Sequence, residues 1–249
     1  MQLSLVQVAS SLDPAENRAG LRDLPPADLV VLPEAYARDF GSPGSDVSSY
    51  AEPLDGPFVT ALVEAAGDRT VIAGMFERSD DGTRPFNTVV VVDGSGVRAS
   101  YRKIHLYDSF GYRESSALSA GDTGQKVVVD VAGVRVGLMT CYDLRFPELA
   151  RRYAGDVDLL AVPAAWVAGP RKVHHWRTLL TARAIENVCY VAGAAQAGPR
   201  YSGTSLVVDP RGDVLAEAGD VAATLAAEVD PALVAETRRE NPSLDNRRL

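Results

Sequence analysis

The stretch Asp28-Leu29-Val30-Val31-Leu32-Pro33-Glu34 decides the fold of this chain. Its four consecutive apolar residues, bounded by an acidic residue and a proline, are typical of a strand that is buried on both faces. The proline ends the strand, and Glu34 follows it directly. In α/β sheets, ligands bind beyond the carboxyl ends of the strands. The stretch therefore predicts an α/β fold in which a carboxylate at the end of a buried strand is part of a functional site.

Two further strands are expected to end at a reactive side chain. The run from Val97 to Arg102 leads into Lys103, and the run from Val134 to Thr140 leads into Cys141. A carboxylate, an ammonium group and a thiol can then meet at one site. This combination suits acyl transfer, because a thiolate attacks a carbonyl group, a carboxylate carries the proton and a cation stabilises the oxyanion.

Each of these three residues also has an ordinary structural interpretation. Cys141 can be a small buried hydrophobic residue, Glu34 a carboxylate at a loop or helix start, and Lys103 a solvated surface charge. The lysine content argues against the last interpretation. The chain has lysine at positions 103, 126 and 172 alone, and its other basic side chains are arginine or histidine. A lysine retained at position 103 is consistent with a role that needs a compact ammonium group rather than a guanidinium fork.

Strand-like runs alternate with helical segments early in the chain and with hairpins later, which predicts a mixed sheet in one domain spanning residues 1–249. Two long irregular stretches, from Arg38 to Gly56 and from Leu106 to Gln125, are expected to be either functional or disordered. Hairpin turns are expected at Asp93 to Gly96, Ala132-Gly133 and Asp209 to Gly212. Helices are expected at Pro14 to Leu24 (after an N-cap at Asp13), Phe58 to Ala66, Pro147 to Tyr153 and His174 to Asn187.

Composition and charge exclude several classes of protein. The 249 residues include 25 basic and 33 acidic side chains, so the net charge of −8 argues against a protein that binds nucleic acid or an anionic membrane. Cys141 and Cys189 are the two cysteines, too few for a disulfide-rich scaffold or a four-thiolate zinc site. The adjacent His174 and His175 point to different sides of a helix, which argues against a shared metal. We therefore expect no metal or other cofactor.

The N-terminal residues show no charged start followed by a long apolar run, and no stretch approaches the roughly 18 consecutive apolar residues of a membrane span. We therefore expect a cytoplasmic protein that does not associate with membranes.

The motifs around the candidate residues resemble those of the nitrilase, or carbon–nitrogen hydrolase, superfamily. They look most like the branch that contains ω-amidases and deaminated-glutathione amidases. The resemblance covers nearly the whole chain, and the motifs that carry it are Leu32 to Glu34, Tyr101 to Leu106, Thr140 to Glu148, His175-Trp176, Ala182 to Asn187 and Gly203 to Pro210.

This resemblance implies a four-layer αββα sandwich with mixed sheets and a Glu-Lys-Cys triad. Glu34 would be the general base, Lys103 the oxyanion stabiliser and Cys141 the nucleophile that forms a thioester. The backbone N–H of Tyr142 would be a second oxyanion donor. Glu114 matches a second glutamate of the family, which would hold Lys103 and contact the substrate amide; its alternative interpretation is a loop carboxylate.

The resemblance also indicates residues that bind the substrate. Arg145, four residues after the cysteine, would bind a substrate carboxylate, or would instead form an ion pair with Glu148. A second arginine of some relatives is replaced by Leu144, which weakens the case for a carbamoyl-amino-acid substrate. Among the aromatic residues, Trp166 is the strongest candidate for the pocket wall.

The predicted function is hydrolysis of a small linear amide, with a carboxylate-bearing ω-amide favoured, to an acid and ammonia. N-carbamoyl-amino-acid or nitrile hydrolysis with the same triad stays an alternative, and so does a non-catalytic binding protein that retains the fold. A thiol redox protein is disfavoured, because the chain has no Cys-x-x-Cys pair. The resemblance further implies a homodimer or larger homo-oligomer, with Arg145 to Arg152 and the C-terminal stretch at the interface.

Overall fold

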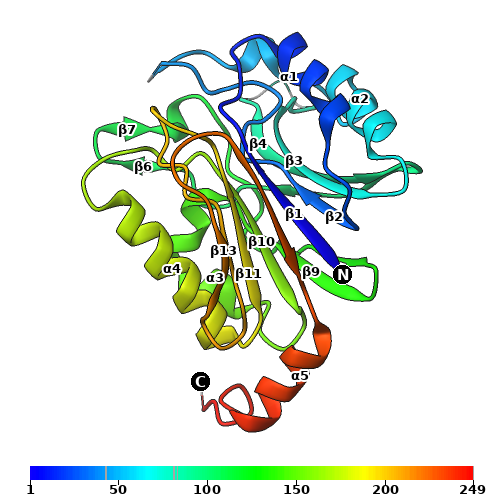
Figure 1. The fold of residues 1–249 in the computed structure, drawn as a ribbon. Helices are drawn as coiled ribbons and strands as arrows, with labels where there is room; N and C mark the ends of the chain where they lie inside the picture. Colours follow the sequence, from blue (N-terminus) through cyan, green and yellow to red (C-terminus); the bar gives the residue numbers. More distant parts are fainter. Residues whose placement is uncertain (43, 81, 83, 249) are drawn as a thin grey trace.

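The computed structural model describes residues 1–42, 44–80, 82 and 84–248, and it contains two six-stranded sheets (Figure 1). A separate two-stranded hairpin is formed by β6 (Asp108–Ser109) and β7 (Tyr112–Arg113). The first sheet has the order β14 (Ala223–Glu228), β1 (Gln2–Gln7), β2 (Leu29–Val31), β3 (Thr70–Glu77), β4 (Phe86–Asp93) and β5 (Gly96–Arg102). The second has the order β13 (Val214–Glu217), β12 (Leu206–Val208), β11 (Tyr190–Ala195), β10 (Leu159–Ala164), β9 (Val134–Leu138) and β8 (Val128–Val131).

Both sheets combine parallel and antiparallel pairs, which confirms the predicted mixed topology. In the first sheet, β2 pairs in parallel with β1 and β3, whereas β4, β5 and β14 join through antiparallel pairs. In the second, β10 pairs in parallel with β9 and β11, and the outer pairs are antiparallel. Parallel centres of this kind put the carboxyl ends of β2 and β3 on the same sheet edge.

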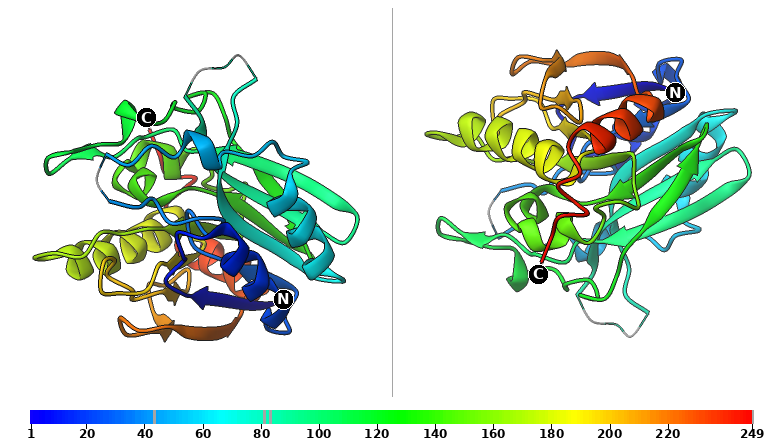
Figure 2. Two further views of the ribbon diagram at one scale, coloured as in Figure 1. Left: turned by 90° about the horizontal axis from the view of Figure 1, so that it is seen from above. Right: turned by 90° about the horizontal axis from the view of Figure 1, so that it is seen from below.

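Four layers result from the alternation of side chains along the strands. In β2, Leu29 and Val31 belong to the core between the two sheets. Val30 points to the opposite face of the first sheet, where it belongs to a second hydrophobic cluster with Phe58 and Leu62. The helix α2 (Pro57–Ala66) covers that outer face together with Leu21 and Leu24, and the helix α1 (Pro14–Gly20) packs against α2. The helix α4 (Lys172–Asn187) covers the second sheet through buried residues such as Trp176, on the opposite side of the molecule (Figures 1 and 2). The expected αββα sandwich is confirmed.

Most expected elements are present with small changes at their ends. The first helix has the predicted Asp13 cap, whose side chain accepts from the Ala15 N–H at 2.8 Å, and it ends at Gly20 before a short 3-10 helix, Leu21–Asp23. The helix α3 (Pro147–Arg151) is shorter than predicted because the chain turns after Arg151. The hairpin turns between β4 and β5, β8 and β9, and β12 and β13 are confirmed.

Two C-terminal elements were not predicted from the sequence. The strand β14 is rich in alanine and alternates between half-buried and exposed residues, so it lacks the β-branched signal of the other strands. It is held by antiparallel pairing with β1. The helix α5 (Pro231–Glu240) follows, capped by Asp230, whose side chain accepts from the Ala232 N–H at 2.8 Å. Within the described residues, no helix has the length and apolar character needed to cross a bilayer.

Candidate active site

Glu34, Lys103 and Cys141 come from three separate strand ends and meet at one cavity of about 700 Å³. Glu34 lies three residues beyond β2, and Lys103 follows β5 directly. Cys141 lies three residues beyond β9, in the second sheet, where it begins the short 3-10 helix Cys141–Arg145 (η4). The cavity is therefore built at the junction of the two sheets, from the carboxyl ends of strands that belong to both.

Lys103 lies between two buried carboxylates. Its Nζ is 2.9 Å from Glu34 Oε1 and 2.8 Å from Glu114 Oε2. The three side chains are each at most 2% exposed. An ammonium group bound on two sides by carboxylates is held at a defined position and is partly neutralised. The structure thus brings Glu114 to the other three candidate catalytic residues.

Asn87 and two backbone groups fix the carboxylates. Asn87 Nδ2 donates to Glu34 Oε1 at 2.7 Å and to Glu114 Oε1 at 2.9 Å. The Ala165 N–H donates to Glu34 Oε2 at 2.6 Å, and the Tyr107 N–H donates to Glu114 Oε2 at 2.6 Å. Asn87 was not predicted from the sequence. The signal was a polar residue near the start of a strand-like run that is rich in valine, where a buried amide needs partners.

Burial and charge act in opposite directions on the two groups that face each other. Burial by itself lowers the pKa of Lys103, but Glu114 and Glu34 outweigh it and hold that pKa well above its ordinary value. Burial raises the pKa of the Cys141 thiol well above its usual range, and the negative charge of Glu34 adds to this, although Lys103 opposes it. The resting site therefore holds an ammonium group and a protonated thiol, and the thiol needs a base in order to react.

The backbone at Cys141 is strained. Its φ of +45° lies in the left-handed region, which costs a non-glycine residue roughly 1–3 kcal/mol and persists only where the surrounding structure holds it. The Asp143 N–H donates to the Thr140 carbonyl oxygen at 2.9 Å and closes the turn around Cys141. Tyr142, the second residue of η4, lines the cavity beside Cys141, and the first N–H groups of a helix have no partner within the helix.

The turn that carries Glu34 depends on a close approach by β3. Ala35 has a φ of +55°, and the Gly74 N–H donates to the Pro33 carbonyl oxygen at 3.2 Å. A Cβ atom at Gly74 would lie 2.4 Å from the Ala35 nitrogen and 2.7 Å from the Glu34 Cα. Gly74 therefore permits a contact that no larger residue allows without moving Glu34.

Arg145 lies in the wall of the cavity with its guanidinium group short of partners. The group is 4.8 Å from the centroid of the Trp166 ring and 5.9 Å from that of Tyr142. Its Nε and Nη2 atoms are buried, and neither has a hydrogen-bond partner among the described residues. The alternative ion pair between Arg145 and Glu148 does not form among the described residues. Leu144, by contrast, is fully buried in the hydrophobic core.

Lys172 and Arg200 are further cations of the cavity, beside Lys103 and Arg145, and neither was predicted from the sequence. The Lys172 Nζ donates to the Tyr107 hydroxyl at 2.9 Å and lies 4.2 Å from the centroid of Phe110. Trp166, as expected, is part of the wall, and its Nε1 donates to the Lys172 carbonyl oxygen at 2.9 Å. The lining is thus strongly aromatic around the cations, with Phe40, Tyr107, Phe110, Tyr112, Tyr142, Trp166 and Tyr201 all contributing.

The remaining reactive side chains lie elsewhere. Cys189 is fully buried in the core, and burial raises the pKa of its thiol to about 12, as expected for an inert residue. Of the two adjacent histidines, His174 is exposed and His175 half-buried. No group of three or more metal-binding side chains was found in the described part of the chain. A second hollow of about 820 Å³ between α1 and α2 contains none of the candidate residues.

Comparison with known proteins gives consistent results. The sequence matches the family model for carbon–nitrogen hydrolases over residues 9–239. It is 42% identical to the deaminated glutathione amidase of Escherichia coli O157:H7 over 224 residues, covering 88% of this chain and 84% of that protein.

Solved structures agree with the sequence comparison. A carbon–nitrogen hydrolase superfamily protein from Xanthomonas campestris, solved with an arsenic adduct in its active site, superposes with a TM-score of 0.89 at 30% identity and covers 100% of this chain and 97% of its own. An amidase from Nesterenkonia sp. gives a TM-score of 0.80 at 28% identity, with 96% and 95% covered.

Proposed function

The chain belongs to the carbon–nitrogen hydrolase family, and from this premise we propose that its cavity hydrolyses a small linear amide that bears a carboxylate. The observation that carries the proposal is the convergence of Glu34, Lys103 and Cys141 at the base of the cavity. Deaminated glutathione amidases among the relatives support an amide substrate.

In the first half of the proposed reaction, Glu34 takes the proton of the Cys141 thiol as the sulfur attacks the amide carbon. The raised pKa of that thiol makes a neighbouring base necessary. The carbonyl oxygen becomes an oxyanion between Lys103 Nζ and the Tyr142 N–H. A buried ammonium group and a backbone donor stabilise this charge without reorganising.

The tetrahedral intermediate then collapses. The C–N bond breaks, Glu34 returns its proton to the nitrogen, and ammonia leaves a thioester on Cys141. In the second half, Glu34 takes a proton from a water molecule as that water attacks the thioester. The C–S bond breaks, the thiol regains its proton and the acid is released. Glu114 keeps Lys103 in place throughout and contacts the substrate amide.

The proposed carboxylate partner is Arg145. Buried polar groups are normally paired, so guanidinium nitrogens without a partner point to an acceptor that arrives with the ligand. A carboxylate supplies that acceptor with favourable charge. Lys172 adds a further positive charge to the same cavity. Trp166 and Tyr142 contact the guanidinium group and keep it at the wall.

Two alternatives use the same triad. For N-carbamoyl-amino-acid hydrolysis, the buried Leu144 provides no second arginine beside Arg145, and Arg200, the other arginine of the cavity lining, is paired with Asp39 at 2.8 Å. For nitrile hydrolysis, the three catalytic groups are equally suitable, and the shape of the cavity decides. A non-catalytic binding protein would need none of the charge arrangement around Lys103.

A panel of carboxylate-bearing amides, neutral amides, nitriles and N-carbamoyl acids tests the proposal. We expect ammonia release to be fastest with an amide that bears a carboxylate. Faster turnover of the nitrile or carbamoyl compounds would favour one of those alternatives, and no turnover of any of them would favour a binding protein.

We further propose a single domain, a homodimer or larger homo-oligomer, and a cytoplasmic location. The motif from Arg145 to Arg152 and the C-terminal stretch are the proposed interface, as implied by the family resemblance. Light scattering coupled to size exclusion measures the assembly, a single cooperative unfolding transition tests the domain, and cell fractionation tests the location.

A further inference from the structure

We propose that Asp143 is a positioning residue that sets the distance between Lys103 and Cys141, an inference that rests on the proposed function of these two residues. Asp143 is fully buried and lies two residues after Cys141 in η4. Asp143 takes part in neither of the ion pairs that Lys103 forms with Glu34 and Glu114, and the proposed catalytic steps do not use it. Its two oxygens nevertheless join the segments that carry the ammonium group and the thiol.

One set of contacts reaches the Lys103 segment. The Tyr101 hydroxyl donates to Asp143 Oδ2 at 2.7 Å. The His105 N–H donates to Oδ1 at 2.9 Å, and His105 Nδ1 lies 2.7 Å from the same oxygen. A carboxylate oxygen accepts hydrogen bonds, so the His105 tautomer that pairs with it is the one with its hydrogen on Nδ1. Tyr101 lies two residues before Lys103 and His105 two residues after it. The Asp143 carboxylate is therefore hydrogen-bonded to the chain on both sides of the proposed catalytic lysine.

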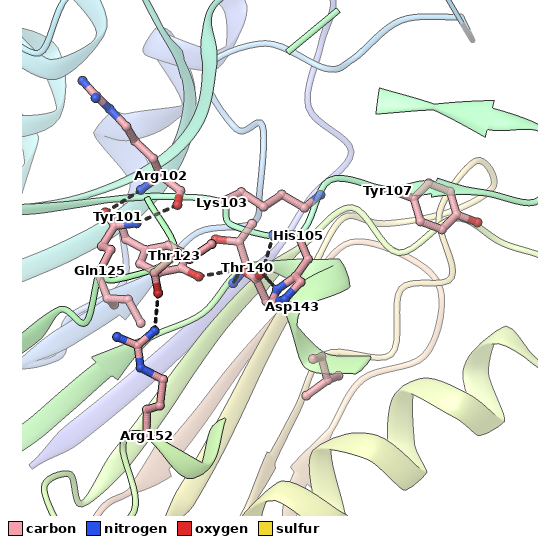
Figure 3. A network of polar contacts seen from close by, with 12 residues as sticks. Tyr101, Arg102, Lys103, His105, Tyr107, Thr123, Gln125, Thr140, Asp143 and Arg152 are labelled. Carbon is pink, nitrogen blue, oxygen red and sulfur yellow. Dashed lines mark hydrogen bonds and ion pairs between the residues drawn. The ribbon is translucent and has the colours of Figure 1, made fainter. Parts of the chain in front are cut away.

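The other contact reaches the Cys141 turn. The Thr140 N–H donates to Asp143 Oδ2 at 3.1 Å, directly before the strained residue. Together with the closing bond from the Asp143 N–H to the Thr140 carbonyl oxygen, this holds the left-handed backbone of Cys141. Figure 3 shows Tyr101, His105 and Thr140 converging on Asp143, while the Lys103 side chain extends away from the network.

Each oxygen of Asp143 accepts two of these four hydrogen bonds, so the carboxylate has little capacity for further partners. We call Asp143 with these contacts the junction, because it joins the Lys103 segment to the Cys141 turn, whereas an ordinary helix cap would contact Thr140 and η4 alone. The surroundings keep it rigid. Burial, followed by the charge of Asp143, raises the pKa of Tyr101 well above its ordinary value, so the hydroxyl stays a donor. The His105 ring stacks on Phe146, with centroids 3.7 Å apart and planes 9° apart.

A simple cap and a positioning junction make different predictions. A cap acts on Thr140 and η4 alone, so losing the contacts to the Lys103 segment would leave catalysis unchanged. A junction needs both sides. Small displacements of reacting groups reduce rates strongly, by about 10²-fold for about 1 Å. Changes at Tyr101 and His105, which do not touch Thr140, therefore separate the two roles.

The first variant is Asp143→Asn, which keeps the shape but replaces one acceptor with a donor. We expect kcat to fall about 10²-fold, while KM changes by less than about threefold, because substrate binding is not affected. The matched control is Asp158→Asn, a buried aspartate that accepts from the Arg135 N–H at 2.9 Å, away from the cavity. It should lose similar thermal stability and keep its kcat.

A second set tests the Lys103 side and stays informative if Asp143→Asn does not fold. Tyr101→Phe and His105→Leu should each lower kcat about tenfold. His105→Asn retains an N–H donor near the position of Nδ1 and should recover most of the loss. Tyr153→Phe, which removes a buried hydroxyl bonded to the Leu138 carbonyl oxygen at 2.7 Å, is the matched control. Combining Tyr101→Phe with Asp143→Asn should add little, because both act through one junction.

Alkylation of Cys141 by iodoacetamide, followed by intact mass, provides a readout that needs no amide substrate. We expect its rate to fall in Asp143→Asn and in His105→Leu, relative to their controls. If wild-type protein hydrolyses no amide, the proposed function fails, while the alkylation rates still test the junction. Unchanged kcat and alkylation in Tyr101→Phe and His105→Leu, or a loss in Asp143→Asn no greater than in Asp158→Asn, would overturn the inference.

Discussion

The Nζ atom of Lys103 lies 2.8 Å from Glu114 Oε2 although both side chains are almost completely buried. A buried ion pair is costly to form and is strongly destabilising when one partner is removed. Here the lysine has a second carboxylate, Glu34, at 2.9 Å, so the pair is part of a charge cluster with an excess of negative groups. A buried cluster with one ammonium group and two carboxylates does little to stabilise the folded core. It is well suited to holding a cation at the place where an oxyanion forms.

Replacing Lys103 with arginine should remove most of the activity although the charge is kept. The guanidinium group is larger and planar, and two carboxylates already occupy the positions around the ammonium group. We expect kcat to fall by at least about 10²-fold. Lys126→Arg is the control, since Lys126 lies at the surface in an ion pair with Asp156. Activity near that of wild type in Lys103→Arg would show that a compact ammonium group is not required.

Glu114→Gln should change the pH dependence of the reaction. Glu114 contributes to the raised pKa of Lys103, so its loss lowers that pKa. The ammonium group is then lost at a lower pH, and the alkaline limb of the kcat/KM profile moves toward neutrality. Rate profiles of wild type and variant measure this shift. An alkaline limb that stays in place would contradict the role of Glu114 in holding the charge of Lys103.

Arg145→Leu should affect substrates according to their charge. A hydrogen bond to a charged group contributes about 1.5–3 kcal/mol, so KM for a carboxylate-bearing amide should rise roughly 10- to 100-fold. A neutral amide of similar size should be little affected. Arg177→Leu removes an exposed arginine of α4, paired with Glu217 at 3.0 Å, and serves as the control. Equal effects on both amides would assign Arg145 a structural role.

Gly74→Ala should disturb Glu34 from a distance. The added methyl group would lie 2.4 Å from the Ala35 nitrogen, so the Glu34 turn must move. We expect a loss of about 1–3 kcal/mol in the free energy of unfolding, together with reduced kcat. Gly219→Ala is the control, because a Cβ atom there meets no atom within 4 Å. Denaturant unfolding and kcat are measured on both variants. A fully active Gly74→Ala would show that the position of Glu34 does not depend on the close approach of β3 at Gly74.

The parts of the fold that were predicted depend on local signals. The apolar run before Glu34, the glycine turns and the capped first helix each carry their own pattern, and the structure contains all three. The strand β14 carries no such pattern, because its place depends on pairing with β1 at the other end of the chain.

The candidate site divides in the same way. Glu34, Lys103 and Cys141 each follow a recognisable strand, so their convergence was predictable, whereas their catalytic roles stay predictions. Asn87 and Asp143 were not selected, because their importance comes from contacts with residues far away in the chain. Asn87 contacts residues 27 and 53 positions away, and Asp143 contacts residues 38 and 42 positions away. Lys172 is likewise part of the cavity only because α4 lies against the aromatic wall.

The central claim is that Cys141 carries the acyl group during amide hydrolysis. Intact-mass spectrometry of the enzyme during turnover of a carboxylate-bearing amide, with ammonia release measured in parallel, tests it most directly. We expect an acyl adduct on Cys141, none on the buried Cys189, and no ammonia release by Cys141→Ala. Ammonia release that is unchanged in Cys141→Ala would contradict the mechanism.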